Sequence, residues 1–221
     1  MRTFPIICVY LCSSVALFAQ PDLSGVWASA GYDANITKDM KSGELPMSPW
    51  AEALYKERQA NHSKDDPESR CLPDGVARRD SYPFKIIQTP TLVLILFEGN
   101  VHSYRQIFLD GRGHPKDLDK NWWGHSIGQW EGDTLVVDTV GFNDRTWLDH
   151  AGHPHSDQLH VTERYTRPDA GRLSVQITID DPVAYAHPWS VTEVSRALPT
   201  RDLHEYICSE SNKDVQHLVS K

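Results

Sequence analysis

Arg172-Leu173-Ser174-Val175-Gln176-Ile177-Thr178-Ile179-Asp180 is the stretch of sequence that decides the fold. Its aliphatic side chains alternate strictly with polar ones, so one face of an extended strand is buried and the other faces water. The turn Asp169-Ala170-Gly171 precedes it, and another alternating segment, 158–166, precedes that turn. The stretch therefore predicts a strand of a half-buried antiparallel sheet.

Strand signals of the same kind recur along most of the chain. Short turns connect them and no crossover helix intervenes, so consecutive hairpins predict an antiparallel meander. Closing the meander into a β-barrel hides its edges. After a short first strand within 22–27, the expected strands are 84–88, 91–97, 101–109, 125–130, 134–142, 158–166, 172–180, 189–197 and 203–208.

Two features complete the expected fold class. Gly25-Val26-Trp27 resembles the Gly-x-Trp entry of lipocalin-type barrels, where the tryptophan plugs one end; an ordinary first strand with a core tryptophan is the alternative. Ser48-Pro49 has the chemistry of a helix start, and good helix formers follow to Arg58. The sequence predicts a mainly β, lipocalin-like or similar barrel with one short helix inserted after the first strand.

The N-terminal segment has the pattern of an export signal. Arg2 precedes an almost wholly apolar run from Phe4 to Phe18, and the small residue Ala19 follows. We expect residues 1–19 to be a signal peptide, 20–221 to be a single domain, and the protein to be periplasmic or secreted. The apolar run is too short for a comfortable membrane span, so no stable membrane insertion is expected.

Charge and cysteine content limit the function classes. The chain has 22 basic and 30 acidic residues, a net charge of -8. An acidic chain without a basic stripe argues against nucleic-acid binding, and no nucleotide cofactor is expected. Beyond residue 19 only Cys71 and Cys208 remain, which predicts a disulfide between the early region and the last strand. Two buried free thiols are the alternative.

A histidine-rich loop in residues 143–156, followed by His160, is the main metal candidate. His153-Pro154-His155 places two imidazoles on one side of an extended segment, where both can reach one ion. We predict a site for a Zn, Fe or Cu ion with His153, His155 and His125 as ligands. Alternative ligands are His150, Asp157 and His160. The His-x-His pattern resembles the first metal motif of cupins, which implies a cupin-like metalloenzyme as one alternative.

An acid–base site needs no metal. Alternation sends Glu163, Arg105 and Glu193 to apolar inner faces, where a charge needs a partner, a ligand or water. The predicted catalytic residues are His160 as proton shuttle, Glu163 as a carboxylic acid or base, and an anion-holding or orienting set of Arg105, Arg145 and Asp149. Two alternatives stay open: Arg105 forms a purely structural ion pair, or the loop histidines are only solvated polar groups.

Aromatic residues suggest where a substrate binds. The predicted binding side chains around the same region are Trp123, Trp130, Trp147, Tyr165 and Glu193. Filling of the core is the alternative for each tryptophan. Gly124-His125-Ser126-Ile127-Gly128 matches the nucleophile elbow of serine hydrolases, but a hairpin follows it instead of the helix that the elbow requires. Ser126 is therefore not expected to be a nucleophile.

The segment Trp130-Glu131-Gly132-Asp133-Thr134-Leu135-Val136-Val137 resembles a hairpin found in a large group of uncharacterised exported bacterial proteins. The resemblance implies an exported, mostly β domain and no particular reaction. We expect an enzyme of lyase, isomerase or hydrolase type that acts on a small organic molecule at the barrel mouth. A non-catalytic carrier of lipocalin type is the main rival, and a secreted interaction module is a third hypothesis.

Overall fold

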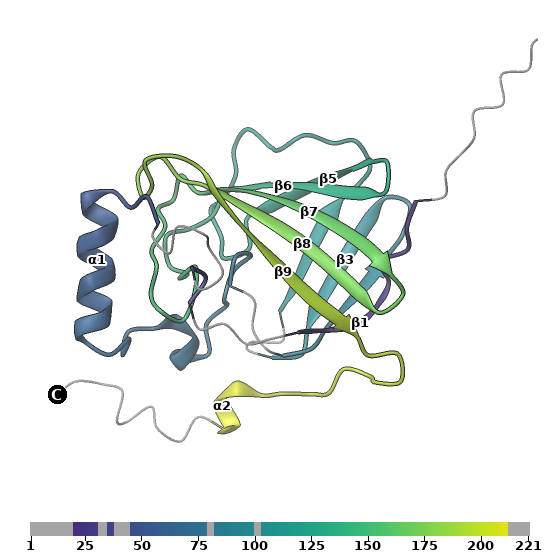
Figure 1. The fold of residues 1–221 in the computed structure, drawn as a ribbon, viewed down its shortest axis with the longest axis horizontal. Coiled ribbons are helices and arrows are strands. Elements are labelled where there is room, and N and C mark those ends of the chain that lie inside the picture. Colours follow the sequence, from purple (N-terminus) through teal and green to yellow (C-terminus); the bar gives the residue numbers. More distant parts are fainter. Residues whose placement is uncertain (1–19, 31–34, 38–44, 79–81, 100–102, 212–221) are drawn as a thin grey trace, which may run out of the picture.

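Nine strands within the described residues close into one barrel (Figure 1). The structure, a computed structural model, describes residues 20–30, 35–37, 45–78, 82–99 and 103–211, so the expected signal peptide lies outside it. Neighbouring strands pair in chain order, and the first pairs with the last to close the barrel. They are β1 (Gly25–Ser29), β2 (Phe84–Gln88), β3 (Leu92–Phe97), β4 (Tyr104–Phe108), β5 (His125–Glu131), β6 (Thr134–Val140), β7 (His160–Asp169), β8 (Arg172–Asp180) and β9 (Trp189–Ala197).

The predicted mainly β barrel with one inserted helix is confirmed, but one strand pair differs from the expected meander. β4 and β5 are parallel and share only the pairs Ile107↔Ser126 and Phe108↔Ile127. A parallel pair requires a long return connection, and residues 109–124 provide it. We call this short β4–β5 junction the seam, because few backbone pairs hold the barrel wall together there.

Side chains fill the barrel interior. In β8, the alternation read from the sequence is confirmed: Leu173, Val175, Ile177 and Ile179 are buried while the residues between them are more exposed. Trp27 of β1 is also buried, and its Nε1 donates to the Leu23 carbonyl at 3.0 Å. The barrel therefore encloses a packed core.

The predicted helix is α1 (Pro49–Ala60), and it lies at one end of the barrel (Figure 1). Ser48 caps its start, since Oγ of Ser48 accepts from the Ala51 backbone N–H at 3.2 Å. The described residues also contain the short helices η1 (Pro67–Arg70) and α2 (Cys208–Ser211). No helix in these described ranges has both the length and the apolar character needed to cross a bilayer.

The expected strand 203–208 is wrong. This segment has no strand pairing, and Cys208 begins α2. Pairing of β1 with β9 has already closed the barrel, so no sheet edge is left for another strand. Glu98 holds the segment instead, by accepting from Arg201 Nη2 at 2.7 Å and from the His204 backbone N–H at 2.9 Å.

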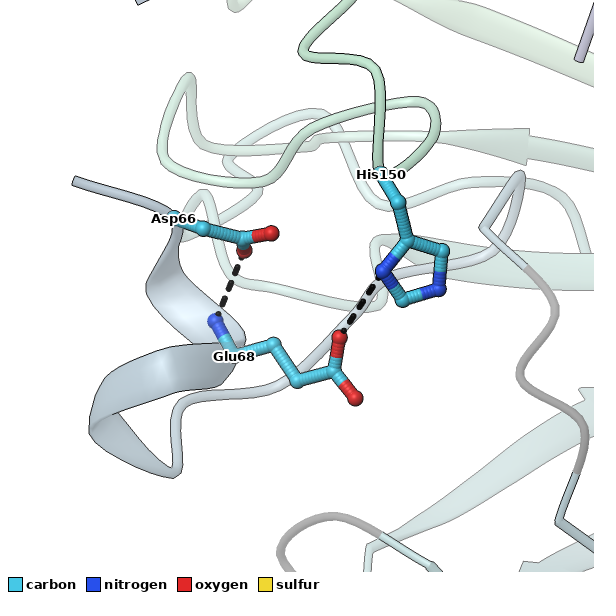
Figure 2. A group of neighbouring side chains, drawn as sticks. All are labelled: Asp66, Glu68 and His150. Atoms are coloured by element: carbon cyan, nitrogen blue, oxygen red, sulfur yellow. Dashed lines mark hydrogen bonds and ion pairs between the residues drawn. The ribbon is translucent and has the colours of Figure 1, made fainter. Parts of the chain in front are cut away.

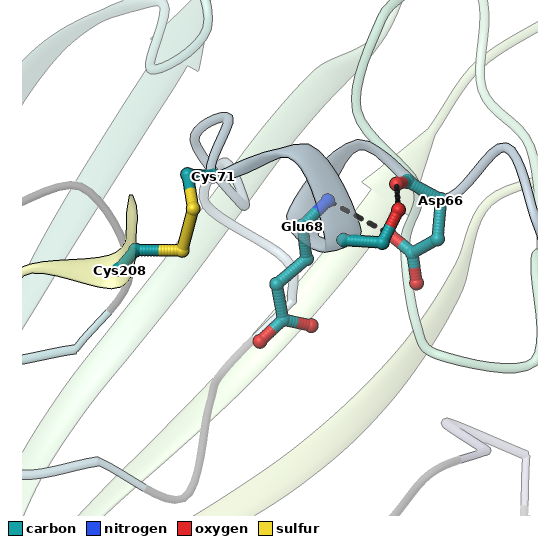
Figure 3. Close-up of a disulfide and its surroundings, with 5 residues drawn as sticks. Asp66, Glu68, Cys71 and Cys208 are labelled. Atoms are coloured by element: carbon teal, nitrogen blue, oxygen red, sulfur yellow. Dashed lines mark hydrogen bonds between the residues drawn. A yellow bond between two sulfur atoms is a disulfide. The ribbon is translucent and has the colours of Figure 1, made fainter. Parts of the chain in front are cut away.

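The predicted disulfide between Cys71 and Cys208 is confirmed (Figure 3). The two cysteines are separated by 137 positions in sequence, with their Cα atoms 5.7 Å apart. Cys71 directly follows η1, and Cys208 lies in α2. The bond therefore fastens the C-terminal segment to the loops at one end of the barrel.

Candidate functional site

The barrel interior contains a buried ion pair between Arg105 of β4 and Glu163 of β7. Both residues occupy the inward positions that alternation predicts, and both are almost completely buried. Arg105 Nη1 donates to Glu163 Oε1 at 3.0 Å, and Arg105 Nη2 donates to Glu163 Oε2. This two-point contact compensates both buried charges, as a structural pair requires.

The other donors of Arg105 are engaged as well. Its Nε donates to Ser126 Oγ at 3.0 Å, and its Nη2 donates to Thr139 Oγ1 at 2.9 Å. The Tyr165 hydroxyl donates to Glu163 Oε1 at 2.7 Å. With its nitrogens occupied in this way, Arg105 has little capacity left to hold a ligand, so the geometry favours the structural alternative for the pair.

The histidine loop is packed rather than open. His153 Nδ1 donates to Asp149 Oδ2 at 2.6 Å, and His155 Nδ1 donates to the Ser156 carbonyl at 2.8 Å. His155 Nε2 lies 2.5 Å from Thr146 Oγ1. Burial lowers the pKa of His155, so its imidazole is neutral and accepts from the threonine hydroxyl. His153 and His155 thus bind different protein groups.

Helix α1 covers this loop. The Tyr55 ring stacks on His153 with centroids 4.3 Å apart, and Arg58 Nη1 donates to the Gly152 carbonyl at 3.0 Å. The Arg58 guanidinium also lies 4.5 Å from the centre of the Trp147 ring. The aromatic and cationic side chains of α1 therefore make the loop part of the core, which alternation and turn signals do not reveal.

Among the described residues, only Asp66, Glu68 and His150 bring three metal-type ligand atoms within 4.8 Å of one another (Figure 2). The predicted set of His125, His153 and His155 does not converge. Arg78 already lies in the Asp66–Glu68–His150 group: its Nη1 donates to Asp66 Oδ1 at 2.7 Å, and its Nη2 lies 2.5 Å from His150 Nδ1. A metal ion there would compete with a buried guanidinium for the same ligand atoms.

A second cluster of titratable groups lies on the outer face of the barrel. His160 Nε2 and His114 Nε2 both donate to Asp138, and the His114 bond to Oδ2 measures 3.4 Å. His114 Nδ1 lies 2.8 Å from His125 Nδ1. We call this chain of contacts, His160–Asp138–His114–His125, the imidazole relay.

The relay fixes which nitrogen of each ring carries a proton. A carboxylate only accepts hydrogen bonds, so Asp138 requires Nε2–H on His114. A neutral His114 then has a lone pair on Nδ1, and His125 must donate from its own Nδ1. The remaining nitrogen of His125, Nε2, consequently carries a lone pair that can accept a proton.

His125 is held in place and kept neutral by its surroundings. Burial lowers its pKa, the neighbouring His114 ring lowers it because two adjacent imidazoles do not readily carry a positive charge together, and the charge of Arg112 lowers it further. Its ring stacks on Phe108 with centroids 5.4 Å apart, and the Arg112 guanidinium lies 3.9 Å from the centre of the Phe108 ring. A neutral imidazole in a fixed orientation has the properties of a general base.

His125 also lines a groove at the seam. The groove has a volume of about 530 Å³, within the range of small-molecule sites. Strands β4 and β5 pair over only two residues, so the wall separates beside that contact. The lining residues of the groove are Ser103, Tyr104, Arg105, Gln106, Phe108, Asn121, Trp123, Gly124, His125 and Ser126.

The other predicted site residues are dispersed. Trp123 lines the groove and stacks on Phe97 at 4.7 Å. Trp147 is buried beneath Arg58, Trp130 packs against the core, and Arg145 is exposed. Glu193 is partly buried on β9, on the face that it shares with Trp189. Of the predicted set, the structure therefore brings His125, His160 and Trp123 to the outer cluster and its groove, which Arg105 also lines from the inner side.

Sequence reasoning missed His114 and Asp138. His114 lies in the return connection 109–124, where no periodicity predicts a neighbour. Asp138 had a usable signal, because alternation with Leu135, Val137 and Thr139 places it on the outer face of β6. Only the register of β6 against β7, with Asp138 opposite Thr162, brings it near His160.

No family model, curated protein or solved structure matches the chain. The resemblance of the 130–137 hairpin to exported bacterial proteins stays a prediction. We therefore infer the function from the site itself.

Proposed function

We propose that the protein is an enzyme that acts on a small organic molecule bound at the seam, with His125 as the general base. The single observation that carries this proposal is the imidazole relay, which ends at a groove-lining histidine. Asp138 and His114 are positioning residues, because they set the tautomer of His125. His160 orients Asp138 from the other side.

The proposed chemistry is the removal of a proton by His125 Nε2. The base takes a proton from a carbon, a hydroxyl or a water molecule, and the resulting imidazolium is stabilised through His114 by the Asp138 carboxylate. Lyase, isomerase and hydrolase reactions all contain such a step. A metal-assisted form is testable by adding Zn, Fe or Cu ions to the same assay, since imidazoles are ligands for all three.

A non-catalytic carrier has less support. A carrier of lipocalin type holds its ligand inside the barrel. Two cavities that border the interior, both lined by Arg78 and Trp123, measure about 40 and 20 Å³, which is room for a few water molecules at most. The groove outside the packed core is the larger space.

Export is part of the proposal. The Cys71–Cys208 disulfide supports an oxidising compartment, and the apolar N-terminal segment supports a signal peptide. We propose a periplasmic or secreted enzyme with a small-molecule substrate and no nucleic-acid partner.

The turnover rate of a variant that lacks the His125 base tests the proposed function. Purified protein is incubated with a panel of sugars, phenols, lactones and esters, and products are detected by proton NMR. We expect His125→Gln to lower the rate on any converted compound by about 10² to 10⁴-fold. His187→Gln, which changes an exposed histidine whose ring bonds the Pro188 carbonyl and no relay residue, is the matched control. Equal rates for wild type and His125→Gln contradict the proposal.

A further inference from the structure

The two walls of the seam groove have the same pattern of side chains. On β4, Tyr104, Gln106 and Phe108 share the outer face, while Arg105 and Ile107 between them point inward. The other wall repeats this spacing with Asn121, Trp123 and His125. Each wall therefore combines aromatic rings with one side-chain amide.

The groove has no charge available for a ligand among its described lining residues. Arg105 is the only lining side chain with a permanent charge, and Glu163 neutralises it from inside the barrel. His125 is neutral because its pKa is lowered. An anionic or cationic compound would leave water without gaining an opposite charge, which is unfavourable.

Polar donors and acceptors remain available at the same walls. No hydrogen bond in the described part of the chain engages the exposed side-chain amide of Gln106. Asn121 uses Oδ1 to accept from the Trp123 backbone N–H at 2.9 Å and Nδ2 to donate to the Asp119 carbonyl at 3.3 Å, which leaves one N–H of its amide for a ligand.

One aromatic face is open to a ligand. Tyr104 is 57% exposed, an unusual state for a large aromatic side chain on a strand. Phe108, by contrast, contacts both Arg112 and His125, so it positions the base. A flat compound with an apolar face and polar edges would satisfy the Tyr104 ring and the amides together.

We infer that the groove binds a neutral ring compound that carries hydroxyl groups, the chemistry of a sugar unit or a phenol. This inference rests on the proposed function for the identity of the groove as the substrate site. It goes further by excluding charged substrates and by assigning specificity to Tyr104 and Gln106. The apolar face of the ring packs on Tyr104, and its hydroxyl groups bond the amide of Gln106.

Binding of three probes tests the inference. Cellobiose and catechol represent the two sources of a neutral hydroxylated ring, and benzoate represents an anionic ring. Affinities are measured by NMR titration of the isotope-labelled full chain. We expect at least one neutral probe to shift groove resonances, and benzoate to bind at least about tenfold more weakly, because its charge has no partner in the groove.

Variants locate the probe. Tyr104→Ala should weaken binding of the neutral probe by about tenfold, the effect of one lost aromatic contact, and Gln106→Ala should also weaken it. Trp50→Ala, which removes another exposed aromatic ring on α1, is the matched control and should leave affinity unchanged. Equal benzoate affinity, failure of both neutral probes to bind, or an unchanged Tyr104→Ala affinity would each overturn the inference.

These experiments distinguish failure of the inferred substrate class from failure of the proposed enzymatic function. Neutral-probe binding that survives His125→Gln supports the groove assignment even if no probe is converted, and absence of conversion then counts against the enzyme alone. Conversion of a charged compound by His125 would overturn the substrate class while the enzyme proposal stands.

Discussion

His160 and Glu163 lie three residues apart on β7 and point to opposite sides of the barrel wall. His160 Nε2 donates to Asp138 on the outer face, whereas Glu163 accepts from Arg105 inside. Strand alternation makes this unavoidable, because residues an odd number of positions apart face opposite ways. The predicted catalytic pair of His160 and Glu163 therefore belongs to two different environments.

Replacement of the inner acid should affect stability. Glu163→Gln removes the charge that compensates buried Arg105, and we expect the free energy of unfolding to fall by about 3 to 5 kcal/mol. Urea denaturation measures the loss. Glu131→Gln breaks a surface pair with Arg164 and should cost about 1 kcal/mol or less. A stable Glu163→Gln protein that has lost all turnover would restore Glu163 as a catalytic residue.

Acid should destabilise the fold through His155. Its pKa is lowered in the folded protein by burial, so the unfolded chain takes up the proton first. The stability that depends on neutral His155 is complete above the unfolded pKa of about 6.5 and is lost as pH falls toward the folded value. Melting temperatures between pH 8 and pH 5 measure this, and His155→Gln should show a smaller fall over that window. An identical pH dependence in the variant contradicts the assignment.

The disulfide should contribute strongly to stability. The Cys71–Cys208 bond closes a loop of 137 positions, and the chain-entropy model gives a contribution of about 4 to 5 kcal/mol for loops of that size. We expect the double variant Cys71→Ser/Cys208→Ser to lose this amount in urea denaturation. Wild-type protein unfolded in the presence of a reductant serves as the control and should match the variant. No change in either sample would show that the bond adds nothing.

The imidazole of His125 should titrate at a lower pH than an ordinary histidine. The lowered pKa of His125 predicts that its Cε1–H resonance titrates with a midpoint below 6.5, and that turnover falls only when the pH drops below that midpoint. Arg112→Gln removes a positive charge that lowers the pKa, so the midpoint should move upward. Arg196→Gln, at an exposed position on β9, should leave it unchanged. A wild-type midpoint above 6.5 would contradict a neutral base.

The alternation of apolar and polar residues predicted the fold well. It did not predict which side chains meet at the candidate site. Strand limits such as 84–88, 172–180 and 189–197 agree with the structure, because alternation directly reflects which face is buried. The inward positions of Arg105 and Glu163 follow from the same rule. The sequence left the partner of Arg105 open, since the pair crosses the barrel interior between β4 and β7, which are not adjacent strands.

The packing of the histidine loop could not be predicted from the sequence either. Spacing placed His153 and His155 near one another, but it carried no information about α1, which is distant in sequence and buries the loop under Tyr55 and Arg58. The sequence did not predict the imidazole relay, for a related reason. Its members come from three strands and the return connection 109–124, and only the closed barrel brings them together.

The protonation state of the relay tests the central claim most directly, and it needs no substrate. Two-bond proton–nitrogen correlation spectra of the full chain at pH 8 distinguish the two nitrogens of each imidazole. We predict that His125 carries its proton on Nδ1 and a lone pair on Nε2, that His114 carries its proton on Nε2, and that Asp138→Asn disturbs both assignments. A spectrum in which His125 is protonated on Nε2 would contradict its role as the base.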